Sequence, residues 1–160
     1  MNPWQGTGQQ VIPGNGSGSG DNGSNNNGNN PDDNDDNNDD TPVSNNLKIT
    51  IGPVSFNATL ENNETAKAFK RLLPMTVDMS ELHGNEKYYY LSNGLPTASS
   101  NPGTIRTGDL MLYGSTCVVL FYETFSTSYT YTRLGRITNP SGLASALGSG
   151  GVNVTFEITD

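Results

Sequence analysis

The chain contains a long stretch without a single apolar side chain. From Gly14 to Thr41 there is no Ala, Val, Ile, Leu, Met, Phe, Trp, Tyr or Cys, and only five such residues precede Leu47. The other 46 lie among the 114 residues from Leu47 to Asp160. A segment with nothing apolar to bury gains too little to offset the entropy that ordering removes. We therefore expect residues 1–45 to be a disordered Gly/Asn/Ser/Asp-rich linker and residues 46–160 to form one domain.

The acidity of the chain belongs to the same leading stretch. Seven Asp residues and no Lys or Arg precede residue 41, whereas residues 41–160 hold nine acidic and eight basic side chains. The domain has no basic stripe, so we expect no nucleic-acid partner. Its longest apolar run, Cys117 to Tyr122, has six residues, far fewer than the roughly 20 that cross a bilayer.

The run Asp32–Asp40 allows two interpretations. Calcium loops place Asp or Asn at alternating positions and add a bidentate Glu and a turning Gly. No Glu precedes Glu61 and no Gly lies between Asp32 and Asp40, which favours a solvated spacer over a calcium site.

The start of the chain lacks the charged-then-apolar pattern of a signal peptide. The Gly/Asn/Ser/Asp-rich stretch nevertheless resembles the region that follows the lipid-bearing Cys of bacterial lipoproteins. We therefore hypothesise an exported, lipid-anchored protein of the bacterial periplasm or cell surface, with Met1 in place of the signal and its Cys. The membrane would then be a partner only through that removed anchor. A gene without a lipobox upstream would contradict this hypothesis.

Alternating apolar and polar residues predict several short strands in the domain. Asn62 or Asn63 is expected to cap a helix that Pro74 ends, and Ser141 to cap a shorter helix that ends at Gly148. The strands are expected at 47–51, 54–60, 87–91, 109–113, 117–123, 128–137 and 152–158, with an irregular stretch at 92–107. Because 117–123 is apolar on both faces, it should be a central strand. The pattern indicates a mainly β fold, a closed or nearly closed β-barrel with two short helices.

Two segments resemble cyclophilins. Thr65–Leu72 resembles their Thr-Ala-x-x-Phe-x-x-Leu helix, and Leu134-Gly135-Arg136-Ile137 resembles their Phe-Gly-Lys-Val. The match is closer to a smaller bacterial group, the cyclophilin-like domains, in which segments similar to Phe125–Tyr129 and Tyr131–Gly135 occur. The resemblance covers about Leu47 to Ile158 and implies a cyclophilin-like barrel.

The resemblance also implies that the catalytic donor of prolyl isomerases is missing. Cyclophilins use an Arg that follows Phe-His to donate a hydrogen bond to the prolyl nitrogen, and Tyr90 stands near that position in Tyr88-Tyr89-Tyr90-Leu91. Ser92–Pro96 replaces the Gln-Gly-Gly-Asp segment of cyclophilins. At the position where cyclophilins have a His before their Phe-Gly, this chain has Thr130 or Tyr131. The apolar strand is retained as Leu120-Phe121-Tyr122, so the apolar pocket is expected to remain.

The residues offer no catalytic or metal centre of their own. His83 is the only histidine and precedes Gly84 in a polar loop, which is typical of a surface turn. Cys117 is the only cysteine and lies in the most apolar run, so we expect it in the core. One His and one Cys supply neither a nucleophile–base pair nor the three or four ligands of a zinc site. We therefore predict no metal and no cofactor.

Aromatic residues are dense in two places, 88–90 and 121–131. In an extended strand Tyr129, Tyr131 and Arg133 share one face. An Arg beside two phenols could hold a carboxylate or a backbone carbonyl. The rings could equally fill the core of a small barrel, with Arg133 stacked on a Tyr. The first interpretation predicts a ligand groove lined by Tyr90, Phe121, Tyr122, Phe125, Tyr129, Tyr131 and Arg133.

We take as the first hypothesis a non-catalytic binding domain that holds an extended peptide or a small ligand in this groove. The first alternative is a divergent peptidyl-prolyl isomerase in which Arg133 or Arg106 replaces the missing Arg. The second is an accessory module of a redox or other enzyme complex.

Overall fold

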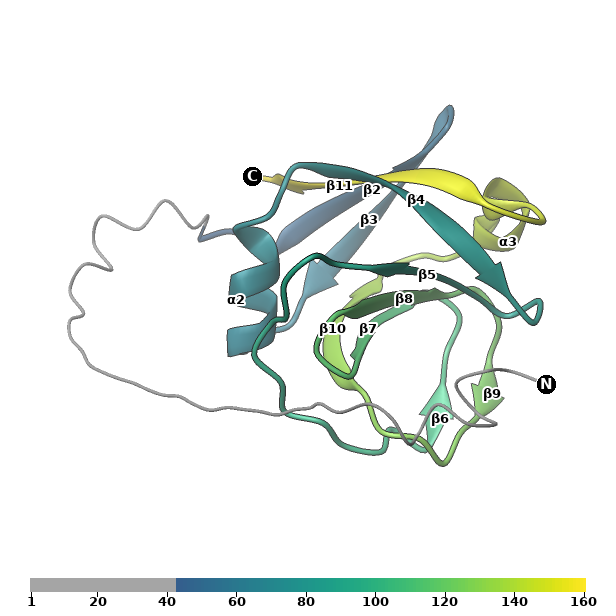
Figure 1. The fold of residues 1–160 in the computed structure, drawn as a ribbon. Coiled ribbons are helices and arrows are strands. Elements are labelled where there is room, and N and C mark those ends of the chain that lie inside the picture. The colour runs from purple at the N-terminus through teal and green to yellow at the C-terminus, as the bar shows by residue number, and fades with distance from the viewer. Residues whose placement is uncertain (1–42) are drawn as a thin grey trace, which may run out of the picture.

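Eight antiparallel strands close into a barrel in the computed structural model, which describes residues 43–160 (Figure 1). Around the barrel their order is β10-β3-β2-β11-β4-β5-β8-β7. These strands are β2 (Asn46–Ile51), β3 (Val54–Leu60), β4 (Met75–Leu82), β5 (Glu86–Tyr90), β7 (Asp109–Tyr113), β8 (Cys117–Phe121), β10 (Thr132–Ile137) and β11 (Val152–Thr159). The remaining elements are β6 (Thr104–Ile105), β9 (Phe125–Ser126), α2 (Glu64–Lys70) and α3 (Leu143–Leu147). The predicted mainly β, closed barrel with two short helices is confirmed.

The predictions that concern the leading stretch fall outside the described residues, apart from 43–45. They are the disordered linker at 1–45, the calcium or spacer interpretation of Asp32–Asp40, and the lipid anchor. No helix among residues 43–160 is long and apolar enough to span a membrane.

The first hairpin forms as its alternation predicts. Leu47, Ile49 and Ile51 of β2 point into the barrel, and β3 pairs with β2 from Asn46↔Thr59 to Ile51↔Val54. Gly52 has φ +58° in the connecting turn, a conformation that glycine adopts without strain. This hairpin forms one wall of the barrel interior.

Helix α2 begins at its predicted cap. The Asn63 side chain accepts a hydrogen bond of 2.7 Å from the Ala66 N–H. Its buried Phe69 packs edge-on against Phe156 of β11, with ring centroids 5.7 Å apart. The helix ends at Lys70, four residues before Pro74, so the proline lies beyond its end.

Helix α3 begins differently from the prediction. Its N-cap is Gly142 with φ +84°, and no side chain caps it, so the expected cap at Ser141 is wrong. The expected Gly148 does end the helix, with φ +67°. Leu143 and Leu147 are buried in the interior cluster, so the helix is held by these two apolar contacts rather than by a cap. Figure 1 shows α2 and α3 near opposite ends of β11.

Strand β4 is absent from the sequence-based prediction. It pairs with β11 on one side and β5 on the other, so the barrel would be open between β11 and β5 without it. Val77 and Met79 are buried and Asp78 and Ser80 are exposed, which is the period-2 pattern of a strand. The apolar–polar alternation runs over three pairs, from Met75 to Ser80, but two of its residues are Asp and Ser, which weaken the strand signal.

Strands β7 and β8 are buried on both faces. Leu110 and Leu120 belong to the interior cluster, whereas Met111 and Val119 belong to a second cluster on the outer side of the barrel. We call this second group the outer cluster: Leu82, Ile105, Met111, Tyr113, Cys117, Val119, Phe121 and Tyr131. The central position of β8 and the core position of Cys117 are confirmed.

Two loops cover the outer cluster. They contain β6 and β9, which pair with each other, and they are linked again by the Ser100↔Tyr131 bridge. We call segments 98–107 and 124–131 the outer cover; Figure 1 shows β6 and β9 beside β7 and β8. Residues 128–131, which were predicted as the start of a strand, lie in this cover, since β10 begins at Thr132.

Candidate functional site

The seven residues predicted to line one groove do not share one surface. Phe121 and Tyr131 are 0% and 2% exposed, because both are packed in the outer cluster. Phe125 belongs to the cover and packs its ring against Phe121, with centroids 5.7 Å apart. Phe121 and Tyr131 belong to the outer cluster and Phe125 packs against it, so these rings are packed as the alternative interpretation expected, but outside the barrel rather than inside it.

Tyr122 lies at a different place, in the interior cluster. Its hydroxyl donates a 2.7 Å hydrogen bond to Glu81 Oε1, and its side chain is buried. Burial and the Glu81 carboxylate both raise the pKa of Tyr122, so its hydroxyl stays protonated as this donor. Tyr122 is therefore part of the packing of the barrel.

Four tyrosines form a group around β5 and β7, and three of them reach the surface. We call Tyr88, Tyr90, Tyr113 and Tyr129 the tyrosine face. Tyr88 and Tyr90 meet edge to face at 5.8 Å, and Tyr113 meets Tyr129 at 6.4 Å in the same way. Tyr90 is 56% exposed, whereas Tyr113 is almost covered and the other two are half-buried.

Strand register sets the spacing of the tyrosine face. Cys117 pairs with Tyr90 on one side and with Tyr113 on the other, so the small thiol lies between two rings. Desolvation and the neighbouring Cys117 raise the pKa of Tyr90 to about 12, and burial raises the pKa of the Cys117 thiol. At neutral pH the face therefore presents phenols that can donate hydrogen bonds, above a protonated thiol that is not a nucleophile.

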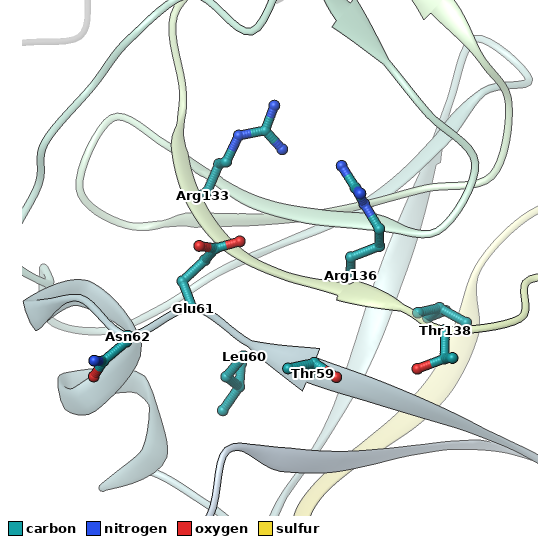
Figure 2. A pocket seen from close by; sticks show the side chains of 8 residues that line it. Thr59, Leu60, Glu61, Asn62, Arg133, Arg136 and Thr138 are labelled. Carbon is teal, nitrogen blue, oxygen red and sulfur yellow. The ribbon is translucent and has the colours of Figure 1, made fainter.

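Arg133 lies in a pocket between β10 and the end of β3. The pocket has a volume of about 440 Å³, and Figure 2 shows its lining side chains. They are Thr59, Leu60, Glu61, Asn62, Arg133, Arg136, Ile137 and Thr138. In Figure 2 the Arg133 and Arg136 side chains leave β10 on the same side, with their guanidinium groups inclined toward each other.

A bulge in β10 places the two arginines together. Residues three apart in a regular strand point to opposite faces. Here the pairing with β7 shifts between Arg133 and Gly135, so Leu134 is an extra residue that points inward and is fully buried. Arg133 and Arg136 consequently both point outward.

Gly135 is required at the bulge by the close approach of β3. A Cβ atom there would lie 2.5 Å from the Thr59 carbonyl oxygen and 3.1 Å from Leu60 Cα. The motif Leu134-Gly135-Arg136 thus reflects the packing of β10 on β3.

The two arginines differ in their contacts. Arg136 Nε donates to Asp109 Oδ1 at 3.1 Å, and fully buried Asp109 also accepts from the Arg106 N–H at 2.9 Å. Within residues 43–160, Arg133 forms no ion pair with a carboxylate. The pocket therefore holds one guanidinium braced by a carboxylate and one that forms no ion pair with the described residues.

Comparison with known proteins identifies the fold. The model of the cyclophilin-like family matches residues 49–157. The chain belongs to the cyclophilin-like family. The solution structure of a hypothetical protein from Archaeoglobus fulgidus is similar, with a TM-score of 0.52 and 20% identity over 76% of this chain and 99% of that chain. No curated protein matches the chain.

In this cyclophilin-like barrel, β5 carries no outward-pointing cation. The resemblance to cyclophilins puts their catalytic Arg near Tyr90, which projects a phenol instead. Lys87 is the only basic residue of β5, and its ammonium group lies on the interior side of the barrel. His83 lies in the β4–β5 turn with φ +54°, exposed, as the surface-turn interpretation expected.

Lys87 ties the α3–β11 loop to the barrel. Its fully buried Nζ donates to Glu81 Oε1 at 2.8 Å and to the carbonyl oxygens of Gly148 and Gly150 at 2.8 and 2.6 Å. The ammonium also lies 5.4 Å from the centroid of the Tyr122 ring. Through these contacts Lys87 holds the α3–β11 loop and β4 in place, so we assign the network a structural role.

Stability in acid is expected to depend on Glu81. Burial raises its pKa, but hydrogen bonds from Lys87, Tyr122 and the Gly84 N–H outweigh burial, and the net pKa is lowered. A lowered folded-state pKa gives stability that is complete above the unfolded pKa, about 4.3, and is lost as pH falls through the folded pKa. Urea midpoints of wild type should therefore fall as pH drops below about 4.5, and this fall should be shallower in Glu81→Gln.

The matched control for this pH dependence is Glu157→Gln, which removes a half-exposed carboxylate paired with Lys48 at 3.8 Å. It should keep the wild-type dependence. Equal slopes for wild type and Glu81→Gln would contradict the assignment.

The sequence pattern indicated neither Arg136 as a residue of the pocket nor Glu81 as the partner of Lys87. The Leu134-Gly135 pair could have indicated a bulge, because glycine inside a strand often marks one. No sequence pattern indicated that Glu81 would meet Lys87 and Tyr122, which are six and 41 residues away. Residues 43–160 contain no cluster of three His, Cys, Asp or Glu side chains that could hold a metal ion.

Proposed function

We propose that this cyclophilin-like domain is a non-catalytic binding domain, and that its ligand is an extended peptide or a small ligand held against the tyrosine face. Of the seven residues named from sequence, Tyr90 and Tyr129 belong to this face. Phe121 and Tyr131 would support it from below. The proposed binding surface therefore keeps only two of the seven residues that the sequence-based hypothesis assigned to the groove.

The exposure of Tyr90 carries this proposal. It is the one aromatic among the large exposed apolar residues of the described chain, and it stands against the ring of Tyr88. Tyrosine is enriched at binding surfaces because its ring buries a large area while its hydroxyl forms hydrogen bonds. A pair of adjacent rings on a rigid strand loses little conformational freedom when a ligand binds.

The chemistry of the face favours binding over isomerisation. Cyclophilin catalysis depends on a cation that donates to the prolyl nitrogen, and the corresponding position here is Tyr90. The raised pKa of Tyr90 keeps a neutral phenol, which is a weaker donor than a guanidinium. Such phenols suit the carbonyl groups of an extended peptide, with proline or aliphatic side chains lying on the rings.

Removal of Tyr90 should weaken peptide binding about tenfold, which corresponds to about 1.4 kcal/mol and is modest for an aromatic hot spot. The probes are short peptides that contain proline between apolar residues. Binding is measured by NMR titration of the amide signals of Tyr88, Tyr90 and Tyr129, in wild type and in Tyr90→Ala.

Leu72→Ala is the matched control, since Leu72 is also exposed, at 42%, but follows α2. It should bind these peptides as wild type does. Shifts confined to other parts of the barrel, or unchanged affinity in Tyr90→Ala, would contradict the proposal. Acceleration of Xaa-Pro isomerisation in exchange NMR that disappears in Arg133→Ala would support the isomerase alternative instead.

A further inference from the structure

One side of β5 carries a carboxyl group followed by two phenol rings. Side chains of a strand alternate between its faces, so Glu86, Tyr88 and Tyr90 share one face at steps of about 7 Å. Tyr88 packs against the outer cluster and Tyr89 against the interior cluster, so this face is the outer one. Glu86 is 0% exposed and Tyr90 is 56% exposed. The row therefore runs from a buried carboxyl group to rings at the surface.

The charge of Glu86 acts on groups beneath the tyrosine face. Burial raises the pKa of the Cys117 thiol and of Tyr131, and the Glu86 carboxylate raises both further. Cys117 pairs with Tyr90 and with Tyr113, so this negative charge reaches the strand positions that carry the two rings. A buried charge is screened less than a charge in water, and its influence extends further.

The groups around the face include no positive partner that would cancel this preference. The side chains that shift the pKa of Tyr90, Tyr113, Tyr131 and Cys117 are other phenols, the thiol, Thr127 and Glu86; none is a Lys or Arg of the described residues. The basic residue of β5, Lys87, directs its ammonium group to the α3–β11 loop on the interior side. The face therefore combines ring surfaces with a nearby carboxyl group.

We propose that the tyrosine face binds a lysine side chain of its peptide ligand, with the ammonium group on the rings of Tyr88 and Tyr90, on the side of Glu86. This inference rests on the function proposed above and adds the charge of the ligand. The face of a phenol ring is negative and attracts an ammonium group within about 6 Å of its centroid. The four-carbon stem of lysine can lie along a ring while its charged end stays hydrated.

Two matched peptides test the proposal. Both contain proline between apolar residues, and they differ only in the residue after proline, which is lysine in one and norleucine in the other. Norleucine has the four-carbon stem of lysine without the ammonium group. The full-length protein is titrated with each peptide, and the amide signals of Tyr88, Tyr90 and Tyr129 are followed by NMR. The lysine peptide should bind about fivefold tighter, as expected for a cation–π contact at a partly exposed site.

Substitutions at Tyr90 separate the rings from the acidic residues at the start of the chain, which every variant retains. Tyr90→Phe keeps a ring and should keep about a fivefold ratio of the two affinities. Tyr90→Leu should bind both peptides more weakly, and the ratio should fall below about twofold because the exposed ring is gone. A fivefold ratio that persists in Tyr90→Leu would overturn the proposal, since charges elsewhere would then attract the lysine.

Glu86→Gln tests the carboxylate and should lower the ratio to about twofold. Glu157→Gln is the matched control, because Glu157 lies on β11 and pairs with Lys48, and it should keep the wild-type ratio. An unchanged ratio in Glu86→Gln would overturn the proposal, and the Tyr90 variants decide it if Glu86→Gln does not fold. Equal affinities of the two peptides in wild type, with shifts on the tyrosine face, would overturn this inference alone. No binding of either peptide would overturn the proposed function as well.

Discussion

Replacing Lys87 by methionine should destabilise the domain by about 4 kcal/mol, the largest effect that we expect from one substitution. Methionine has a similar length but donates no hydrogen bond. Glu81 would lose its ionic partner, and the carbonyl oxygens of Gly148 and Gly150 would lose a buried donor. Breaking a buried pair leaves these groups desolvated and uncompensated, and for that reason the effect exceeds the value of an ordinary hydrogen bond. Urea unfolding followed by circular dichroism measures it.

Lys48→Met is the control for this prediction. Lys48 pairs with Glu157 at 3.8 Å, and both side chains are about two-fifths exposed. A pair of this kind contributes about 0.5 kcal/mol or less, since water screens it. A loss below about 1 kcal/mol in Lys87→Met would show that water replaces the ammonium at the barrel end, contrary to the structural role assigned here.

Gly135→Ala is expected to destabilise the domain by about 3 kcal/mol, although it adds only one methyl group. The new Cβ would meet the Thr59 carbonyl and Leu60 Cα, and neither atom can rotate away as a side chain can. The β10–β3 pairing must open to admit the methyl group, and this pairing closes the barrel. Chemical denaturation gives the loss, and hydrogen exchange at Arg136 and Ile137 should show the opening.

Gly94→Ala is the matched substitution. The atom nearest to a Cβ there, at 2.9 Å, is Ser115 Oγ, which belongs to a side chain that can rotate. We expect a loss of about 1 kcal/mol or less. If Gly135→Ala were as mild as Gly94→Ala, the close approach of β10 and β3 would not be the reason for glycine at the bulge.

Local patterns predicted the elements whose partners are near in sequence. The β2–β3 hairpin follows from alternation on both sides of Gly52-Pro53, and the start of α2 follows from Asn63. The continuous apolar run at 117–122 predicted a strand buried on both faces, and β8 is buried throughout. Each depends on a physical preference that acts within a few residues, such as capping or the two-residue period of a strand.

The placement of the aromatic residues could not be predicted in this way. Tyr131 and Phe125 were assigned to a surface groove, but the fold of the outer cover places Tyr131 in the outer cluster and packs Phe125 against it. The cover depends on pairing of Thr104 with Ser126 and of Ser100 with Tyr131, which are far apart in the chain. Such loops carry no apolar period, so nothing in the sequence marks which face they cover.

By itself, the sequence determined that a domain of short strands with two helices begins near residue 46, and that it resembles cyclophilins without their catalytic arginine. Only the tertiary structure decided which polar groups lie together: Lys87 bonds to Glu81, and Arg133 and Arg136 line one pocket. The reason is that the periodicity of a strand predicts whether a residue faces inward or outward, but not which residues lie beside it. Barrel closure by β4 and the extra residue in β10 set its neighbours, and both depend on contacts between distant segments.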